Sequence, residues 1–321
     1  MNIVIIGCGN IGFRHFESIV NSELECNLLL VDTNQKAFEK YKNHNSKVDI
    51  KFYDRIENYD RLIDIAIICT TSRKRAELLK CLLKTNKVKS LILEKFLFTK
   101  LSDYQEMHDL FLSKKIKVWV NQWMSSERHF VELSKYFINS PEEIEMKISG
   151  NNWGMCCNSV HYIDYFHYLS RRAKLVMHNS CLSNKIIESK RKGYFELFGA
   201  YEVHSANGNI LSVECSNKNA GELKYFTNIE INSSSSSFKG KFSLGQLNGI
   251  YNLKGKKIEI DYKLDFQSKM TESLVRSIKT KNDCDLPIYK QSMSHHKLVF
   301  EEFKKIFELN NYDISEGIPI T

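Results

Sequence analysis

Short apolar runs alternate with amphipathic segments along about the first 136 residues of the chain. In the amphipathic segments apolar residues recur at helical spacing, as in residues 73–83, where Ala76, Leu79 and Leu83 share one stripe, and again in residues 101–111. Such alternation is typical of parallel strands that are joined by crossover helices. The predicted buried strands are residues 3–6, 28–31, 65–69, 90–93 and 118–120.

A period-two alternation replaces this pattern after residue 121 and runs from residue 144 to residue 261. It predicts half-buried antiparallel strands, with Gly, Asn and Ser clusters as the turns between them. Examples are residues 194–198, 223–231 and 257–261, and helices are expected at 161–169 and 295–309. The serine run at 233–237 is interpreted as a polar hairpin loop rather than a linker or a modification site.

Together these patterns predict an α/β fold with two domains. Residues 1–121 are expected to form a Rossmann domain, which is a doubly wound parallel sheet. Residues 122–321 are expected to form an α/β domain with an open, mainly antiparallel sheet and a closing C-terminal helix. A length of 321 residues and a hydrophobic content of 42% are sufficient for a core in each domain.

The formal net charge of +8 suits a nucleic acid, an acidic membrane surface or an anionic small substrate. Acidic and basic residues are interspersed along the chain, as in residues 54–61, which favours a solvated surface over a nucleic-acid interface. The N-terminus lacks the basic region and long apolar stretch of a secretion signal, and no apolar run approaches membrane-spanning length. We therefore expect a cytoplasmic protein without nucleic-acid or membrane partners.

The nine cysteines include no pair at zinc-ligand spacing, so reduced thiols and no metal site are expected. The adjacent Cys156 and Cys157 are interpreted as two buried small residues. His295 and His296 are also adjacent and would point to different faces of a helix, which makes them a poor ligand pair.

A glycine-rich motif, GCGNIG, directly follows the first predicted strand and opens a helix. In a dinucleotide-binding turn of this kind, Gly7 permits the tight turn, Gly9 lets the backbone approach a pyrophosphate, and Gly12 lets the helix pack against the strand. Asn10 and Ile11 complete the helix start, where free amides and the helix dipole favour phosphate. The alternative is a chance cluster of glycines in a turn that binds no nucleotide.

Asp32 ends the second predicted strand, twenty residues after Gly12. A carboxylate there can accept hydrogen bonds from both hydroxyls of the adenine ribose, and it repels the additional phosphate of NADP. The sequence therefore predicts NAD as the cofactor in preference to NADP.

Three further segments of the first predicted domain stand out: Phe13-Arg14-His15 after the glycine motif, Ile68-Cys69-Thr70-Thr71, and Glu94-Lys95 after a strand. On these motifs the chain resembles the Gfo/Idh/MocA oxidoreductase family. The segments 152–154, 158–164 and 286–296 extend this resemblance, and the first two resemble members encoded with bacterial capsule and lipopolysaccharide sugar pathways. The resemblance implies a cofactor site that includes Thr70, Thr71, Glu94 and Lys95.

The resemblance also implies that Lys95 and His161 are catalytic, because in this family a lysine and a histidine act together on a substrate hydroxyl or carbonyl. Alcohol oxidation by hydride transfer needs a base for the hydroxyl proton, and reduction needs the matching acid. Asp164, one helical turn after His161, is expected either to orient substrate or to hold the helix. Trp153 is expected either to stack on a sugar ring or to belong to the core, and Asn158 is a further candidate substrate contact.

Two departures from the family pattern affect these expectations. Phe96 replaces the proline that usually follows the lysine, and that proline often carries a cis bond that phenylalanine rarely adopts. Cys157 and Ser159 replace the usual aspartate and glycine before the histidine, so the aspartate is missing as a proton relay.

The main hypothesis is an NAD(H)-dependent oxidoreductase that acts on a sugar, nucleotide sugar or sugar acid in bacterial surface-glycan biosynthesis. The first alternative is a non-catalytic NAD-binding sensor or scaffold of the same fold. The second is a redox-neutral epimerase with tightly bound NAD. By resemblance, a homodimer or homotetramer is expected.

Overall fold

A computed structural model describes residues 1–321 except 43–47, 58, 60, 218–225 and 244. The chain divides into two compact units. The first unit contains residues 1–122, residues 265–293 and Thr321, and the second contains residues 123–264 and 294–320. The boundary between residues 293 and 294 falls inside helix α7, Tyr289–Leu309.

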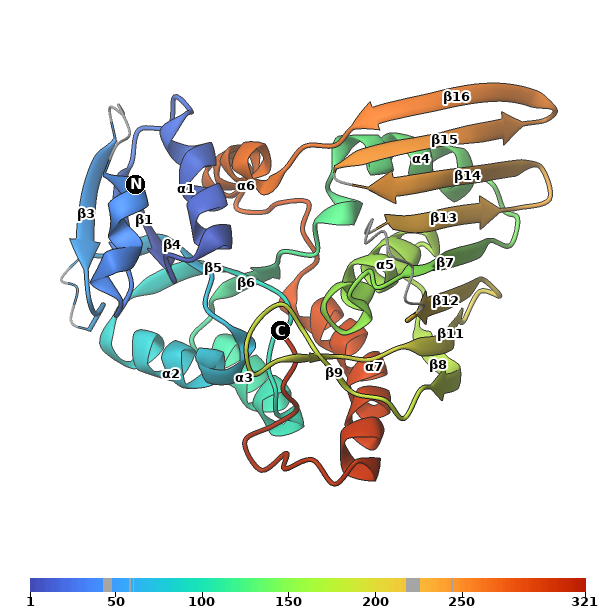
Figure 1. The fold of residues 1–321 in the computed structure, drawn as a ribbon. Coiled ribbons are helices and arrows are strands. Elements are labelled where there is room, and N and C mark those ends of the chain that lie inside the picture. The colour runs from blue at the N-terminus through green and yellow to red at the C-terminus, as the bar shows by residue number, and fades with distance from the viewer. Residues whose placement is uncertain (43–47, 58, 60, 218–225, 244) are drawn as a thin grey trace. The chain divides into compact units, whose positions relative to one another are not determined.

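The first unit is built on a six-stranded sheet in the order β3-β2-β1-β4-β5-β6, and every neighbouring pair is parallel. The chain moves outward from β1 to β3 and then returns to place β4 beside β1 (Figure 1). Ligands of doubly wound sheets bind at this kind of reversal, beyond the carboxyl ends of the strands. The strands are β1 (Asn2–Ile6), β2 (Asn27–Val31), β3 (Asp49–Tyr53), β4 (Ile63–Ile68), β5 (Val88–Leu93) and β6 (Lys117–Val120).

Helices cover both faces of this sheet, as buried parallel strands require (Figure 1). Helices α1 (Asn10–Val20) and α6 (Gln267–Lys281) pack together on one face, and α2 (Arg75–Thr85) and α3 (Leu101–Ser113) lie on the other. Alternate residues of β1 point to the two faces, so Ile3 and Ile5 join the core beneath α1 and α6. The predicted doubly wound Rossmann domain is confirmed.

The return of residues 265–293 to the first unit differs from the predicted division into residues 1–121 and 122–321. The physical reason is the apolar stripe of α6, because Leu274, Val275 and Ile278 are buried in the core of the first sheet. The sequence also does not predict β3, a mostly exposed edge strand without an apolar run.

The second unit is built on an eight-stranded sheet in the order β16-β15-β14-β13-β7-β12-β11-β8. Among the strands that the structure describes in this sheet, only β7 and β12 pair in parallel, so the predicted open, mainly antiparallel sheet is confirmed. The strands are β7 (Glu145–Asn151), β8 (Leu175–Leu182), β11 (Gly199–Ser205), β12 (Ile210–Ser216), β13 (Phe226–Asn232), β14 (Ser236–Ser243), β15 (Gln246–Leu253) and β16 (Lys256–Lys263). A separate two-stranded sheet pairs β9 (Ile187–Glu188) with β10 (Phe195–Glu196).

Helices α4 (Arg128–Ile138) and α5 (Met155–Leu169) cover one face of the large sheet. Tyr136 of α4 stacks on Tyr251 of β15, and the Tyr162 hydroxyl of α5 donates a 3.0 Å hydrogen bond to Thr227 of β13. The opposite face carries the partly exposed residues of each strand, as in β11, where buried and half-buried positions alternate.

Several predicted elements have different bounds in the structure. Helix α5 begins at Met155 rather than at 161, and α7 begins at Tyr289 rather than at 295. The expected strand 194–198 is reduced to β10, and residues 223–225 of the expected strand 223–231 lie outside the described residues. The polar hairpin loop expected at 233–237 connects β13 and β14 but is shorter, at residues 233–235, because Ser236 and Ser237 belong to β14. No helix in the described ranges combines the length and apolar character needed to cross a membrane.

Candidate active site

The glycine turn between β1 and α1 leaves no room for a side chain at two of its three glycines. Gly7 has φ +97°, and a Cβ atom there would lie 2.8 Å from the backbone of Cys69 and Thr70. A Cβ atom on Gly12 would lie 2.1 Å from the carbonyl oxygen of Gly7. The sequence therefore requires glycine at both positions, as the predicted tight turn and close packing imply.

Gly9 has a different environment, because no atom lies within 4 Å of an ideal Cβ atom there. Gly9 is the N-cap of α1, and no side chain in the described part of the chain caps this helix. The first turn, from Asn10 to Gly12, also contains no acidic residue. Open space beside uncapped helix amides suits a pyrophosphate, so these residues fit a dinucleotide.

Asp32 lies directly beside this turn. Its Oδ2 accepts a 2.7 Å hydrogen bond from the backbone N–H of Cys8, and its Oδ1 accepts a 2.8 Å bond from the N–H of Asn34. The carboxylate is thus anchored and half-buried at the end of β2. An anchored carboxylate at this position can accept hydrogen bonds from the hydroxyls of a ribose.

Lys40 and Tyr41 also reach the glycine turn, although the sequence does not predict this. The Lys40 ammonium donates a 3.0 Å hydrogen bond to the carbonyl of Gly9, and the Tyr41 hydroxyl donates a 3.4 Å bond to the same carbonyl. Lys40 also lies 5.1 Å from the ring centroid of Phe13. Both residues come from the short helix Gln35–Tyr41, and no sequence motif signals its approach to the turn.

Thr70 and Thr71 follow β4, next to Gly7 in the sheet. Within the part of the chain that the structure describes, the buried Oγ1 of Thr70 has no hydrogen-bond partner. Thr71 is exposed and is the N-cap of the short helix Ser72–Lys74. An unsatisfied hydroxyl beside the glycine turn is a second feature that fits a bound polar ligand.

Glu94 directly follows β5 and is buried, with 6% of its surface exposed. Its Oε1 lies 2.9 Å from Nε2 of His15 and accepts a 2.6 Å hydrogen bond from the Asn121 amide. Burial opposes its charge, but the hydrogen bonds from His15 and Asn121 and the charge interaction with His15 lower the pKa of Glu94 overall. Its carboxylate therefore joins α1 to β6, and Lys95 is the residue of this pair that is more accessible.

A buried arginine holds the segment that carries Lys95. Arg75 is 1% exposed, and its guanidinium donates to the carbonyls of Glu94 and Phe96 at 2.5 Å, to that of Leu97 at 2.9 Å, and to that of Thr70. The Lys95–Phe96 peptide bond is cis.

His161 lies inside α5 rather than at a helix start, because the helix begins at Met155 after Gly154, which has φ +77°. It is 5% exposed, and its ring centroid lies 5.8 Å from that of Trp123. Asn158 is half-buried, and its amide donates a 2.8 Å hydrogen bond to the carbonyl of Trp153, which fixes the first turn of the helix.

Trp153 has the environment of a core residue, which is the alternative that the sequence left open. It is 5% exposed, and its indole N–H donates a 3.0 Å hydrogen bond to the carbonyl of Glu214. Its ring also meets Tyr162 edge to face at 5.4 Å.

Asp164 is fully buried in a polar cluster of the second unit. Its Oδ2 accepts a 2.5 Å hydrogen bond from the Ser125 hydroxyl, and its Oδ1 lies 3.3 Å from Arg172 and 3.7 Å from His295. Burial raises the pKa of Asp164 to about 6, although Arg172 and Ser125 lower it in part. This geometry favours the helix-holding role over a direct substrate contact.

The predicted site residues thus fall into two groups. The first unit brings Gly7, Gly9, Gly12, Asp32, Thr70, Glu94 and Lys95 to the carboxyl edge of its sheet. The second unit carries Trp153, Asn158, His161 and Asp164 on α5 and the turn before it. His15 and Arg75 complete the first group, and only His15 is part of a sequence motif.

A family model described as an oxidoreductase family with an NAD-binding Rossmann fold, GFO_IDH_MocA, matches residues 1–122. No match to the chain was found among curated proteins.

Solved structures with the same fold have low sequence identity to the chain. KijD10, a 3-ketoreductase from Actinomadura kijaniata in complex with NADP and TDP-benzene, is 11% identical with a TM-score of 0.69, over 93% of this chain and 95% of that chain. An oxidoreductase from Agrobacterium radiobacter in complex with NAD+, L-tartaric acid and magnesium is 13% identical with a TM-score of 0.69, over 93% and 94%. The transcriptional regulator Gal80p from Kluyveromyces lactis is 15% identical with a TM-score of 0.72, over 96% and 92%.

Proposed function

We propose that the chain, whose residues 1–122 match the model of the Gfo/Idh/MocA oxidoreductase family, transfers hydride between NAD(H) and a sugar, nucleotide sugar or sugar acid. The observation that carries this proposal is the glycine turn with its open space at Gly9 and the carboxylate of Asp32 anchored beside it. These features suit the diphosphate and the adenine ribose of the cofactor.

The preference for NAD over NADP rests on the charge of Asp32. A fixed carboxylate at the ribose position repels the additional phosphate of NADP. Similar folds carry either cofactor, since the ketoreductase is in complex with NADP and the Agrobacterium enzyme with NAD+. Lys40 lies near the same turn and provides a positive charge there, so direct titration of both cofactors is the decisive comparison.

Lys95 and His161 are the residues that we assign to proton transfer. The bound nicotinamide supplies or accepts the hydride, and the protein has to move the proton of the substrate hydroxyl. In oxidation one of these side chains accepts that proton, and in reduction it returns it. Arg75 holds the backbone on both sides of Lys95, which orients the lysine.

The assignment of the other second-unit residues follows their burial. Asn158 is half-buried and remains the candidate substrate contact. Trp153 and Asp164 are buried, so we assign them the support of α5 beneath the substrate. A sugar-type substrate is supported by the ketoreductase in complex with TDP-benzene and by the tartaric acid complex. The positive net charge suits anionic substrates of this class, and the sequence resemblance supports a role in bacterial surface-glycan biosynthesis.

A non-catalytic NAD-binding sensor is the second candidate, because the fold is similar to that of the transcriptional regulator Gal80p. The absence of the usual aspartate before His161 also favours it, since Cys157 occupies that position. A sensor would bind the cofactor without turnover.

Quenching of tryptophan fluorescence by NAD, NADH, NADP and NADPH tests the cofactor assignment. We expect NAD(H) to bind more tightly than NADP(H). Failure of all four cofactors to bind would overturn the proposed function, and a clear preference for NADP(H) would overturn the role of Asp32.

Incubation with cofactor and a panel of nucleotide sugars and sugar acids tests the reaction, with nicotinamide absorbance as the signal. We expect turnover in the wild type, and we expect Lys95→Ala to abolish it while cofactor affinity is retained. Cofactor binding without turnover across the panel would favour the sensor. Product formed without a net change in NADH would instead identify a redox-neutral epimerase.

A further inference from the structure

Two histidines and a glutamate gather on the face of the large sheet that α4 and α5 do not cover. Glu202 and His204 are two residues apart on β11, so their side chains point to the same face of the sheet. The neighbouring residues Val203 and Ser205 are buried on the opposite face. His178 comes from β8, the edge strand that pairs with β11.

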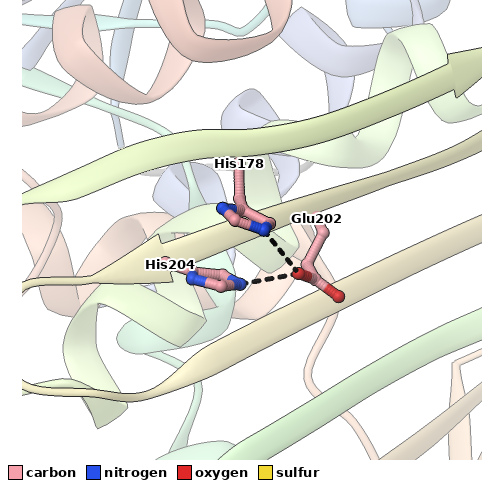
Figure 2. Close-up of side chains that lie close together, drawn as sticks. All are labelled: His178, Glu202 and His204. Carbon is pink, nitrogen blue, oxygen red and sulfur yellow. Dashed lines mark hydrogen bonds and ion pairs between the residues drawn. The ribbon is translucent and has the colours of Figure 1, made fainter.

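A β-bulge brings His178 to this face. Glu202 pairs with Asn179 and Val203 pairs with Met177, so His178 is an additional residue in β8 at the register shift. A bulge of this kind re-aims a side chain without ending the pairing of the strands. His178 is therefore directed toward Glu202 and His204, as Figure 2 shows.

The ligand atoms of the three side chains lie within 4.8 Å of one another. Nε2 of His204 lies 2.6 Å from Oε1 of Glu202, and Nε2 of His178 lies 4.0 Å from the same oxygen (Figure 2). The two imidazole rings are stacked, with centroids 4.0 Å apart and an interplanar angle of 11°. Both rings thus present the same nitrogen to one carboxylate oxygen.

We propose that His178, Glu202 and His204 bind one divalent transition-metal ion of the zinc type, with water in the remaining coordination positions. Two imidazoles and a carboxylate are ligands that Zn²⁺, Co²⁺ and Ni²⁺ accept, whereas Mg²⁺ and Ca²⁺ require oxygen ligands. Neighbouring ligands of a tetrahedral zinc ion lie about 3.4 Å apart, as metal–ligand distances of about 2.1 Å imply. The 4.0 and 2.6 Å separations lie on either side of that value.

The surroundings allow the three side chains to move to the separations that a metal ion requires. The His178 side chain is 59% exposed and can rotate inward, while those of Glu202 and His204 are 35% and 31% exposed. The Ser212 hydroxyl of β12 lies 3.5 Å from the second carboxylate oxygen of Glu202 and can orient it. A metal there would link the edge strand β8 to β11. This proposal does not depend on the proposed redox function.

Isothermal titration calorimetry of the full-length, chelator-treated protein with Zn²⁺ tests the site. We expect one Zn²⁺ per chain and no competition from excess Mg²⁺. Because loss of a supporting residue alone weakens metal binding about 10- to 100-fold, each of His178→Ala, His204→Ala and Glu202→Gln should weaken Zn²⁺ binding by about 100-fold or more. Titration with Co²⁺ should give the visible absorption of nitrogen and oxygen ligands, without a thiolate charge-transfer band.

Cys181→Ser is the matched control, because Cys181 is an exposed thiol on β8 that pairs with Ala200 and shares the face of the site. This variant should bind Zn²⁺ like the wild type. The proposal is overturned if wild-type protein binds no Zn²⁺, if the His178→Ala/His204→Ala double variant retains the affinity, or if Cys181→Ser removes it. Because the three ligand side chains are partly exposed, the metal-free variants should melt at the wild-type temperature, which separates lost ligation from misfolding.

Discussion

The backbone N–H of Cys8 donates a 2.7 Å hydrogen bond to Oδ2 of Asp32. This bond links the glycine turn at the end of β1 to the acidic residue at the end of β2. Burial is the main cause that raises the pKa of the Cys8 thiol to about 12, and the nearby charge of Asp32 raises it further. Cys8 therefore contributes its backbone amide to the site while its thiol stays protonated.

Asp32→Asn should weaken NAD binding more than NADP binding. The amide oxygen of asparagine can still accept from Cys8, but the charge that attracts ribose hydroxyls and repels the NADP phosphate is lost. Hydrogen bonds to a charged group contribute about 1.5–3 kcal/mol, so we expect a loss of NAD affinity of about tenfold to a hundredfold. Fluorescence titration measures both affinities, with the exposed Asp54→Asn as the control. An unchanged ratio of the two affinities would contradict the role of Asp32.

Gly9→Ala should weaken NAD binding with little change in stability, whereas Gly12→Ala should lower stability. No atom lies within 4 Å of a Cβ atom at Gly9, so its replacement should change stability by less than about 0.5 kcal/mol and yet obstruct the pyrophosphate. At Gly12 the added atom meets the Gly7 carbonyl at 2.1 Å, and overpacking of this kind costs about 1–3 kcal/mol. Thermal melting and NAD titration of both variants separate the two effects. A stable Gly9→Ala variant that binds NAD normally would argue against the proposed phosphate position.

Arg75→Lys should loosen the segment that carries Lys95. A lysine ammonium cannot reproduce the planar fork that donates to the carbonyls of Glu94, Phe96 and Leu97. Because these carbonyls are buried, we expect a stability loss of about 1–3 kcal/mol. We also expect faster amide hydrogen exchange in residues 94–97. The control is Arg73→Lys, because Arg73 is exposed only two residues earlier. Equal exchange in the two variants would remove Arg75 from the positioning of Lys95.

Asp164→Asn should change how stability depends on pH. Burial raises the pKa of Asp164 from 3.8 to about 6, so between these values the folded chain holds a proton that the unfolded chain has released. The contribution of Asp164 to stability is therefore fully present below pH 4 and is lost as pH rises to about 6. At about 1.4 kcal/mol per pKa unit, the stability of Asp164→Asn relative to wild type should rise by about 3 kcal/mol across this window.

Denaturant unfolding at several pH values measures that difference. The difference is more informative than the wild-type curve, because burial lowers the pKa of the nearby His167 to about 4 and changes stability in the opposite direction. The exposed Asp49→Asn is the control. A difference that does not vary between pH 4 and 7 would contradict an elevated pKa of Asp164.

The parts of the fold that the sequence predicts are those with strong local patterns. The buried runs of β1, β2, β4, β5 and β6 are continuous and apolar because both faces of a parallel sheet are covered. Strand β3 lacks this signal because it is an exposed edge strand. The return of α6 to the first unit is not predictable from its own amphipathic pattern, because that pattern does not specify which sheet it covers.

The candidate site shows the same division. The glycine turn and Asp32 are predictable, because the turn requires these residue types at a fixed local spacing. Arg75 gives no local signal, because its partners are backbone carbonyls distant in sequence. The grouping of His178 with Glu202 and His204 depends on strand pairing and on a bulge, neither of which appears in residue spacing.

The late position of α6 in the chain has a consequence for synthesis. Ile3, Ile5 and Leu28 lie in the same core as Leu274 and Val275. During translation, the first sheet therefore emerges long before the helix that completes the covering of this face, which ends at Lys281. Until α6 is synthesised, the nascent chain carries an incompletely covered apolar surface, and exposed surface of this kind is where chaperones act and aggregation begins.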